Sequence, residues 1–178
     1  MDPLTGDGTR LRELRPEDLD DFLAIVGDDR VTSWMAFDSH TRESAEKMLT
    51  GIVTRSAQQD RPDYMLAVTR LDDDHVIGFG RIAPSGTQAG KLAYAIGADH
   101  WGRGYATDVA RTLVRFGFGS LELHRISAAI GPENLASVAV VKRLGFTYEG
   151  RLRDHVFTNG AWRDSLLYSL LATEFRTG

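Results

Sequence analysis

The chain has 178 residues, of which 42% are hydrophobic and 26% charged, and it contains no cysteine. A chain of this length buries roughly 70% of its unfolded surface as one domain, so we expect a single domain over residues 1–178. The lack of cysteine excludes disulfide frameworks, thiolate zinc sites and cysteine nucleophiles. The net charge of −4 is the opposite of the basic face that nucleic-acid binding requires.

Residues 1–12 mix Asp, Gly, Thr and Arg and contain no apolar segment typical of a signal peptide. No apolar run approaches the roughly 18 residues that would span a bilayer. We therefore expect a cytoplasmic protein with neither a membrane nor a nucleic acid as partner.

The first half of the chain predicts strands and two helices. Pro16, followed by acidic residues, opens a short helix through Val26, and Thr41 caps a second helix. The acidic segment 72–75 joins two strands as a hairpin. The runs with strand-like composition are Thr9–Leu14, Tyr64–Leu71, Val76–Ile82 and Leu92–Ile96.

The second half alternates helices and strands. Apolar residues at helical spacing predict a helix from Ala106 to near Gly119, and a strand follows over 126–130. Asn134 caps a helix through Leu144, which Gly145 ends in the left-handed conformation. Asn159-Gly160 makes a tight turn between two closing strands, about Phe146–Phe157 and Trp162–Leu171. The order predicts an α/β fold, a mixed sheet with helices on both faces.

A glycine-rich loop, Trp101-Gly102-Arg103-Gly104-Tyr105-Ala106-Thr107, lies between a predicted strand and a predicted helix. The glycines allow a tight turn, and the N–H groups of the first helical turn have no partner within the helix. Such groups bind anions, so a diphosphate suits this loop. The alternative is a turn that uses glycine only for its backbone angles.

Two other phosphate-binding motifs do not match. A Rossmann fingerprint begins with Gly102 and Gly104, but Thr107 stands where it requires Gly or Ala, and the loop follows the fourth predicted strand instead of opening the fold. A P-loop requires Gly-Lys-Ser/Thr, which is absent here.

Three segments occur together in an order that resembles the GNAT acyltransferase superfamily, specifically its RimJ/RimL-like branch. They are Trp101-Gly-Arg-Gly-Tyr-Ala106, Asn134-Leu-Ala-Ser137 and Leu144-Gly-Phe-Thr-Tyr-Glu-Gly150. The resemblance extends from Arg10–Asp18 to Asp164–Tyr168. It implies one GNAT domain with a mostly antiparallel twisted sheet of about seven strands and about four helices.

The resemblance also implies acetyl-CoA as co-substrate and no metal. The loop amides would hold the diphosphate, and the pantetheine arm would pair with the strand end like an added strand. Asn134 is interpreted as a helix cap or as a direct contact of the cofactor. Arg103 and Arg143 are interpreted as phosphate ligands or as solvated surface charges. The expected contacts are Ile96, Ala98, Trp101, Gly102, Arg103, Gly104, Tyr105, Ala106, Thr107, Asn134, Ser137 and Arg143.

For catalysis, the resemblance implies that the backbone N–H near Ile96 stabilises the oxyanion and that Ser137 protonates the leaving thiolate. The tyrosine acid of many GNAT enzymes is replaced by Val141, and Val156 stands where RimL has a proposed glutamate base. Asp154, His155 and Glu149 are the nearby candidates for the base, of which histidine alone ordinarily titrates near neutral pH, and a water chain is the alternative.

The aromatic residues Trp34, Phe37, Tyr94 and Tyr168 are candidates for the wall of an acceptor pocket or members of the core. We expect an N-acetyltransferase acting on a protein N-terminal α-amine or a small-molecule amine. The alternatives are an acyl-CoA-binding regulatory module without turnover and an enzyme using a larger acyl group such as succinyl-CoA. An exposed sheet edge or helix pair would support a homodimer.

Overall fold

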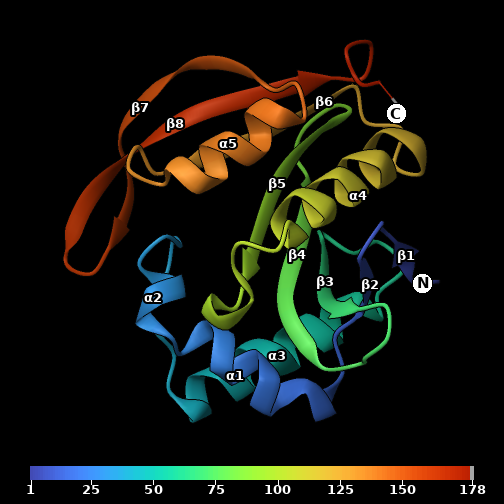
Figure 1. Ribbon diagram of the computed structural model, residues 1–178, viewed down its shortest axis with the longest axis vertical. Helices are drawn as coiled ribbons and strands as arrows, with labels where there is room; N and C mark the ends of the chain where they lie inside the picture. Colours follow the sequence, from blue (N-terminus) through green and yellow to red (C-terminus); the bar gives the residue numbers. More distant parts are fainter. Residues whose placement is uncertain (177–178) are drawn as a thin grey trace.

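The structure, a computed structural model that describes residues 1–176, is built around one eight-stranded sheet (Figure 1). Its strands are β1 (Leu4–Thr5), β2 (Thr9–Glu13), β3 (Tyr64–Arg70), β4 (Val76–Pro84), β5 (Ala89–Ile96), β6 (Arg125–Ile130), β7 (Thr147–Thr158) and β8 (Ala161–Leu171). They are ordered β1-β2-β3-β4-β5-β6-β8-β7. Neighbouring strands are antiparallel except β5 and β6.

Helices cover both faces of the sheet (Figure 1). They are α1 (Leu19–Val26), α2 (Asp29–Thr32), α3 (Arg42–Ser56), α4 (Tyr105–Gly119) and α5 (Leu135–Arg143), with short 3₁₀ turns at η1 (Pro16–Asp18) and η2 (Ala98–His100). No helix within residues 1–176 has the length and apolar character needed to cross a membrane.

Strand alternation divides the core into two layers. On β3, Leu66 and Val68 belong to the core layer that includes α4 and α5, while Met65 and Ala67 belong to the layer that includes α1 and α3. Because successive side chains point to opposite faces, a strand covered on both sides is apolar along its length, as β3 is.

The expected α/β fold, with its mixed and mostly antiparallel sheet, is confirmed. The structure adds two short elements, so the described residues contain eight strands and five α-helices instead of about seven and about four. β1 is only two residues long and is defined by pairing with β2, which no periodicity reveals. α2 is one turn, begun by Asp28, whose side chain accepts a hydrogen bond from the Arg30 N–H.

Several local predictions hold at single-residue level. Thr41 caps α3 by accepting from Ser44 N–H, and Gly145 follows α5 with φ of +86°. Asn159 and Gly160 have φ of +49° and +71°, as a tight hairpin turn between β7 and β8 requires.

The two parallel strands separate soon after they meet. β5 and β6 share only the pairs Ala89↔Arg125, Gly90↔Ile126 and Lys91↔Ser127 in the described part of the chain. Farther along β5, Gly97 N–H donates to Ile77 of β4 over 2.8 Å. Backbone groups alternate in direction along a strand, so the N–H of Ile96 faces away from β4, toward the opening between β5 and β6.

Gly78 of β4 leaves no room for a side chain where β4 passes the end of β5. A Cβ at this position would collide with the carbonyl oxygen of Ala95 and lie 2.8 Å from Ile96 Cδ1. We predict that Gly78→Ala lowers the free energy of unfolding by about 1–3 kcal/mol, the usual cost of overpacking, in urea denaturation.

The matched control is Gly119→Ala at the end of α4, where no heavy atom lies within 4 Å of the added Cβ. It should change the free energy of unfolding by less than about 1 kcal/mol, because the added methyl group meets no neighbour among residues 1–176 and alanine has a higher helix propensity than glycine. Equal losses in the two variants would contradict the assigned close contact.

Candidate functional site

The glycine-rich loop turns through two left-handed residues between η2 and α4. Gly102 has φ of +74°, and Gly104, the residue that caps α4, has φ of +83°. Among the residues that the structure describes, no heavy atom lies within 4 Å of a Cβ built on either glycine. The glycines are therefore needed for the backbone conformation and not to make room for a neighbouring side chain.

Five consecutive N–H groups, from Gly102 to Ala106, find no acceptor among residues 1–176. The next two, from Thr107 and Asp108, both donate to the Gly104 carbonyl over 3.1 Å. Left-handed turns at a helix N-terminus aim such amides at a shared point and bind anions there. The geometry is suited to a phosphate or diphosphate group.

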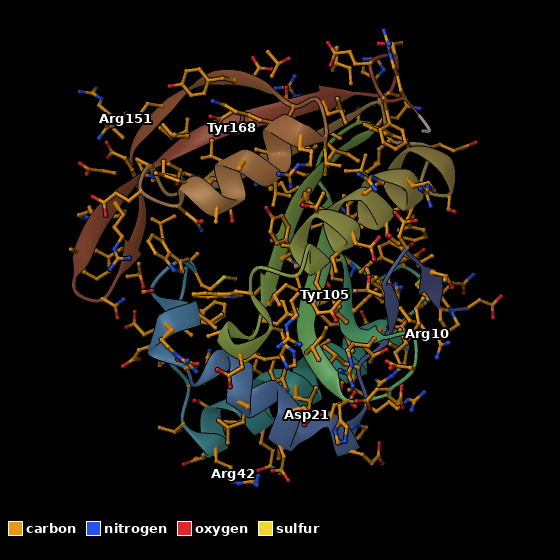
Figure 2. All side chains as sticks on the ribbon, in the orientation of Figure 1. Arg10, Asp21, Arg42, Tyr105, Arg151 and Tyr168 are labelled. Atoms are coloured by element: carbon orange, nitrogen blue, oxygen red, sulfur yellow. The ribbon has the colours of Figure 1, made fainter. Side chains whose placement is uncertain are left out.

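Two arginines lie at this loop, Arg103 within it and Arg143 beside its end. Arg143, from the end of α5, donates to the Thr107 hydroxyl over 3.1 Å, which brings its positive charge to the start of α4. Arg103 is exposed and its guanidinium lies 3.4 Å from the Asp99 carbonyl oxygen. Tyr105, labelled in Figure 2, is the first residue of α4. The loop residues predicted from sequence therefore form one cluster with Arg143.

The end of β5 lies directly before the loop. Ile96 is buried, and its carbonyl accepts from the indole Nε1 of Trp101 over 2.7 Å. Ala98 belongs to η2 and not to the strand, and its carbonyl accepts from the backbone N–H of Trp101. Extended pairing along this edge therefore ends at Ile96.

α5 begins with the polar residues that the sequence analysis singled out. The Asn134 side chain accepts from Ser137 N–H over 3.0 Å, which confirms its capping role. The Tyr94 hydroxyl of β5 lies 3.5 Å from the Ser137 carbonyl, so α5 and β5 meet at Ser137. Burial raises the pKa of Tyr94, and this phenol stays protonated at neutral pH.

His155 lies apart from these groups, in an irregular part of the β7–β8 hairpin. The register shifts between Leu152 and Val156, and Asp154 takes a positive φ of +46°. The exposed imidazole has Nδ1 3.0 Å from Ser165 Oγ. The bulge interrupts the simple alternation expected for Asp154 and His155. No hydrogen bond in the described residues joins His155 to Ser137.

The four aromatic candidates separate into two pairs. Trp34 is 46% exposed, and Phe37 packs at the edge of the α1–α3 core. Tyr94 and Tyr168 belong to the core on the α4–α5 side, and Tyr168 is only 4% exposed, on β8 (Figure 2). The structure therefore does not bring the four rings into one continuous wall.

A set of contacts that the sequence did not reveal joins the hairpin tip to the segment after α2. Asp38 accepts from Thr158 Oγ1 and from Asn159 N–H, both over 2.7 Å, and Arg163 donates to the Ser33 carbonyl over 2.8 Å. The Thr158 hydroxyl and the Asn159 amide hold the pKa of Asp38 below its ordinary value. We call these five residues the hairpin clasp. Figure 1 shows the hairpin tip beside α2.

A second unforeseen contact holds the N-terminal turn against the first turn of α4. Asp108 accepts from the backbone N–H groups of Asp7 and Gly8 over 2.8 and 2.9 Å and from Thr9 Oγ1 over 2.7 Å. Partial burial raises the pKa of Asp108, but the hydrogen bonds from Gly8, Thr9 and Asp7 outweigh it and keep the pKa below its ordinary value. The ionised carboxylate therefore fixes the start of α4.

We predict that Asp108→Asn lowers the free energy of unfolding at pH 7 by about 1–2 kcal/mol, because an amide cannot accept all three hydrogen bonds. A depressed carboxyl pKa adds stability above about pH 4, the unfolded value, and this stability is lost as the pH falls toward the folded value. The difference between wild type and variant should thus shrink from pH 5 to pH 3, measured by urea denaturation at each pH.

Glu46→Gln, which changes an exposed carboxylate on α3, is the control and should show little difference at any pH. A pH-independent loss in Asp108→Asn would contradict the role of the ionised carboxylate.

Residues 9–147 match the family model described as an acetyltransferase (GNAT) domain. The N-acetyltransferase p20 of Bacillus licheniformis, named as uncharacterized, is 29% identical over 177 residues, 98% of this chain and 99% of that protein.

Two other proteins are similar over most of the chain. The [Ribosomal protein uS5]-alanine N-acetyltransferase of Escherichia coli is 27% identical over 144 residues, covering 79% of this chain and 74% of that one. The solved RimJ of Mycobacterium smegmatis, in complex with CoA-disulfide, has a TM-score of 0.82 at 24% identity and covers 98% of this chain and 91% of that chain.

Proposed function

The chain belongs to the GNAT acetyltransferase family and is an N-acetyltransferase, and on this basis we propose that it transfers the acetyl group of acetyl-CoA directly to a primary amine while both substrates are bound. The observation that carries the proposal is the run of N–H groups from Gly102 to Ala106, without acceptors in the described residues, next to the opening between β5 and β6.

The loop and the strand edge divide the binding of acetyl-CoA between them. The amides of Gly102–Ala106 hold the diphosphate, with Arg103 and Arg143 adding positive charge. The pantetheine arm pairs with the unpaired edge of β5 up to Ile96, as an added strand would. Asn134 and the start of α5 flank this arm. Residues 1–176 contain no cluster of His, Asp or Glu suited to a metal ion, and the proposed reaction uses none.

The chemistry requires an oxyanion donor and a proton for the leaving thiolate. The amine nitrogen forms a bond to the thioester carbonyl carbon, and the negative charge that develops on the oxygen is stabilised by the N–H of Ile96, which faces the opening. When the carbon–sulfur bond breaks, the Ser137 hydroxyl gives its proton to sulfur and takes back a proton from water, into which the amine proton is finally released. Ser137 lies in the first turn of α5, where the helix dipole favours negative charge.

We assign removal of the amine proton to His155 or to water. The Nδ1 atom of His155 lies 3.0 Å from Ser165 Oγ, and in the tautomer in which Nδ1–H donates to that hydroxyl, Nε2 is the nitrogen that accepts a proton. In the His155→Ala variant, an unchanged dependence of kcat/KM on pH would assign the step to water.

The acceptor is proposed to be a protein N-terminal α-amine or a small-molecule amine. The E. coli relative is named for acetylating an alanine of ribosomal protein uS5, which supports the first class. The test is a screen of peptides with free N-termini, amino acids, polyamines and aminoglycosides, each with acetyl-CoA and with succinyl-CoA. Thiol release and mass spectrometry of the products are the readouts.

Acetylated product with acetyl-CoA supports the proposal. Product only with succinyl-CoA would support the larger acyl group, and CoA binding without product from any acceptor would favour a regulatory module.

We predict that Gly104→Val abolishes measurable CoA binding in calorimetry while the chain stays folded. A branched residue strains a backbone at φ of +83° and displaces the amides from the diphosphate. Gly86→Val is the matched control, because Gly86 also has positive φ, +75°, and open space around its Cβ. Both variants should lose similar stability, and unchanged CoA affinity in folded Gly104→Val would refute the loop assignment.

We predict that Ser137→Ala lowers kcat by about tenfold to a thousandfold, the range for one proton donor, with little change in CoA affinity. The substitution is small and leaves the Asn134 cap on the Ser137 backbone N–H in place. Ser120→Ala, at the C-terminal end of α4, serves as control. A kcat within about twofold of wild type would mean that solvent protonates the thiolate.

A further inference from the structure

Trp101 is a partly exposed residue whose indole N–H makes a specific hydrogen bond to the backbone. The side chain is 48% exposed, yet its indole Nε1 lies 2.7 Å from the Ile96 carbonyl oxygen. A distance of 2.7 Å is at the short end of the range for N–H···O hydrogen bonds, so this bond to one backbone carbonyl indicates a defined position for both groups.

With this bond, both polar groups of the peptide unit between Ile96 and Gly97 have hydrogen-bond partners. The N–H of that unit donates to the Ile77 carbonyl over 2.8 Å, and its C=O accepts from Trp101. Next to Ile77 on β4, Gly78 is in close contact with β5 at Ala95 and Ile96. The backbone of Ile96 is thus held from β4 on one side and by the indole on the other.

The same residue begins the anion-binding loop. The N–H groups without acceptors among residues 1–176 start at Gly102, directly after Trp101. Neither Gly102 nor Gly104 is held by packing, since no heavy atom lies within 4 Å of a Cβ at either position. The indole bond is therefore the side-chain contact that ties the start of the loop to the end of β5, beside the backbone hydrogen bond from the Trp101 N–H to the Ala98 carbonyl in η2.

We propose that the Trp101 indole N–H is a positioning group that sets the orientation of the Ile96 backbone and couples it to the diphosphate-binding loop. Trp101 acts through Ile96 and is not itself a catalytic residue. The inference rests on the proposed function for its kinetic consequence, but the effect on the Ile96 backbone exists without any acceptor.

The test is Trp101→Phe, which keeps an aromatic ring and removes the N–H, with Trp101→Tyr as a second variant. Trp162→Phe is the matched control, because Trp162 is 61% exposed on the β7–β8 hairpin and has no part in the proposed site. Each purified protein is measured for thermal stability, CoA affinity by calorimetry, kinetics with the best acceptor, and amide hydrogen exchange of peptides covering 92–101.

In both Trp101 variants we expect kcat to fall about three- to tenfold, the equivalent of one hydrogen bond, while the Kd for CoA changes less than about threefold because the loop amides remain. Amides of 94–97 should exchange at least about fivefold faster without ligand. Trp162→Phe should match wild type in all four measurements.

Unchanged exchange in 94–97 would overturn the inference. So would a loss of CoA affinity equal to the loss of kcat/KM, since Trp101 would then be a direct ligand contact. If wild type transfers no acetyl group to any acceptor, the proposed function fails, while hydrogen exchange still decides the role of Trp101.

Discussion

The site depends on the separation of two parallel strands. β5 and β6 pair at only three positions, and beyond them the edge of β5 faces an opening instead of a neighbour. Parallel strands need a crossover connection, and here that connection contains α4. The connection leaves from the end of β5, so the N-terminus of α4, with its N–H groups, lies where the opening is widest. One topological requirement thus supplies both an unpaired strand edge and an anion-binding helix end.

The conformation of the loop between them is fixed by contacts of its flanking residues and not by packing against its glycines. Gly102 and Gly104 take left-handed conformations in open space. Glycine adopts these conformations without steric strain, but no neighbouring side chain among the described residues holds either residue in place. Order comes from contacts outside the glycines: Trp101 to the end of β5, Asp108 to the N-terminal turn, and Arg143 to Thr107. Each contact joins the loop to a different part of the fold. The conformation of the anion site therefore depends on the positions of all three parts.

Sequence reasoning succeeded where a local rule determines the structure. The caps at Thr41 and Asn134 and the left-handed Gly145 follow from local backbone chemistry, and the structure confirms them. It failed where a contact joins distant residues, because neither period nor composition reveals that Asp38 meets Thr158 120 positions later. Composition also could not show whether an aromatic residue lies in the core or at the surface. An aromatic residue suits either a core or a pocket, and only the folded structure shows that Trp34 is exposed after α2 while Tyr168 is buried on β8. The roles of Ser137 and His155 remain proposals.

The hairpin clasp also limits how the chain can vary in length. A residue inserted in a strand displaces everything beyond it by about 3.3 Å, so two extra residues in β7 and two in β8 would carry Thr158 about 7 Å past Asp38. The β7–β8 hairpin therefore has a length set by a contact at its far end, unlike an ordinary surface hairpin, which tolerates insertions at its tip. In the segment 85–88, where β4 turns into β5, hydrogen bonds join Ser85 to Ala89 and Gln88 to His124 and Arg125, so residues added between Ser85 and Gln88 would disturb none of these contacts.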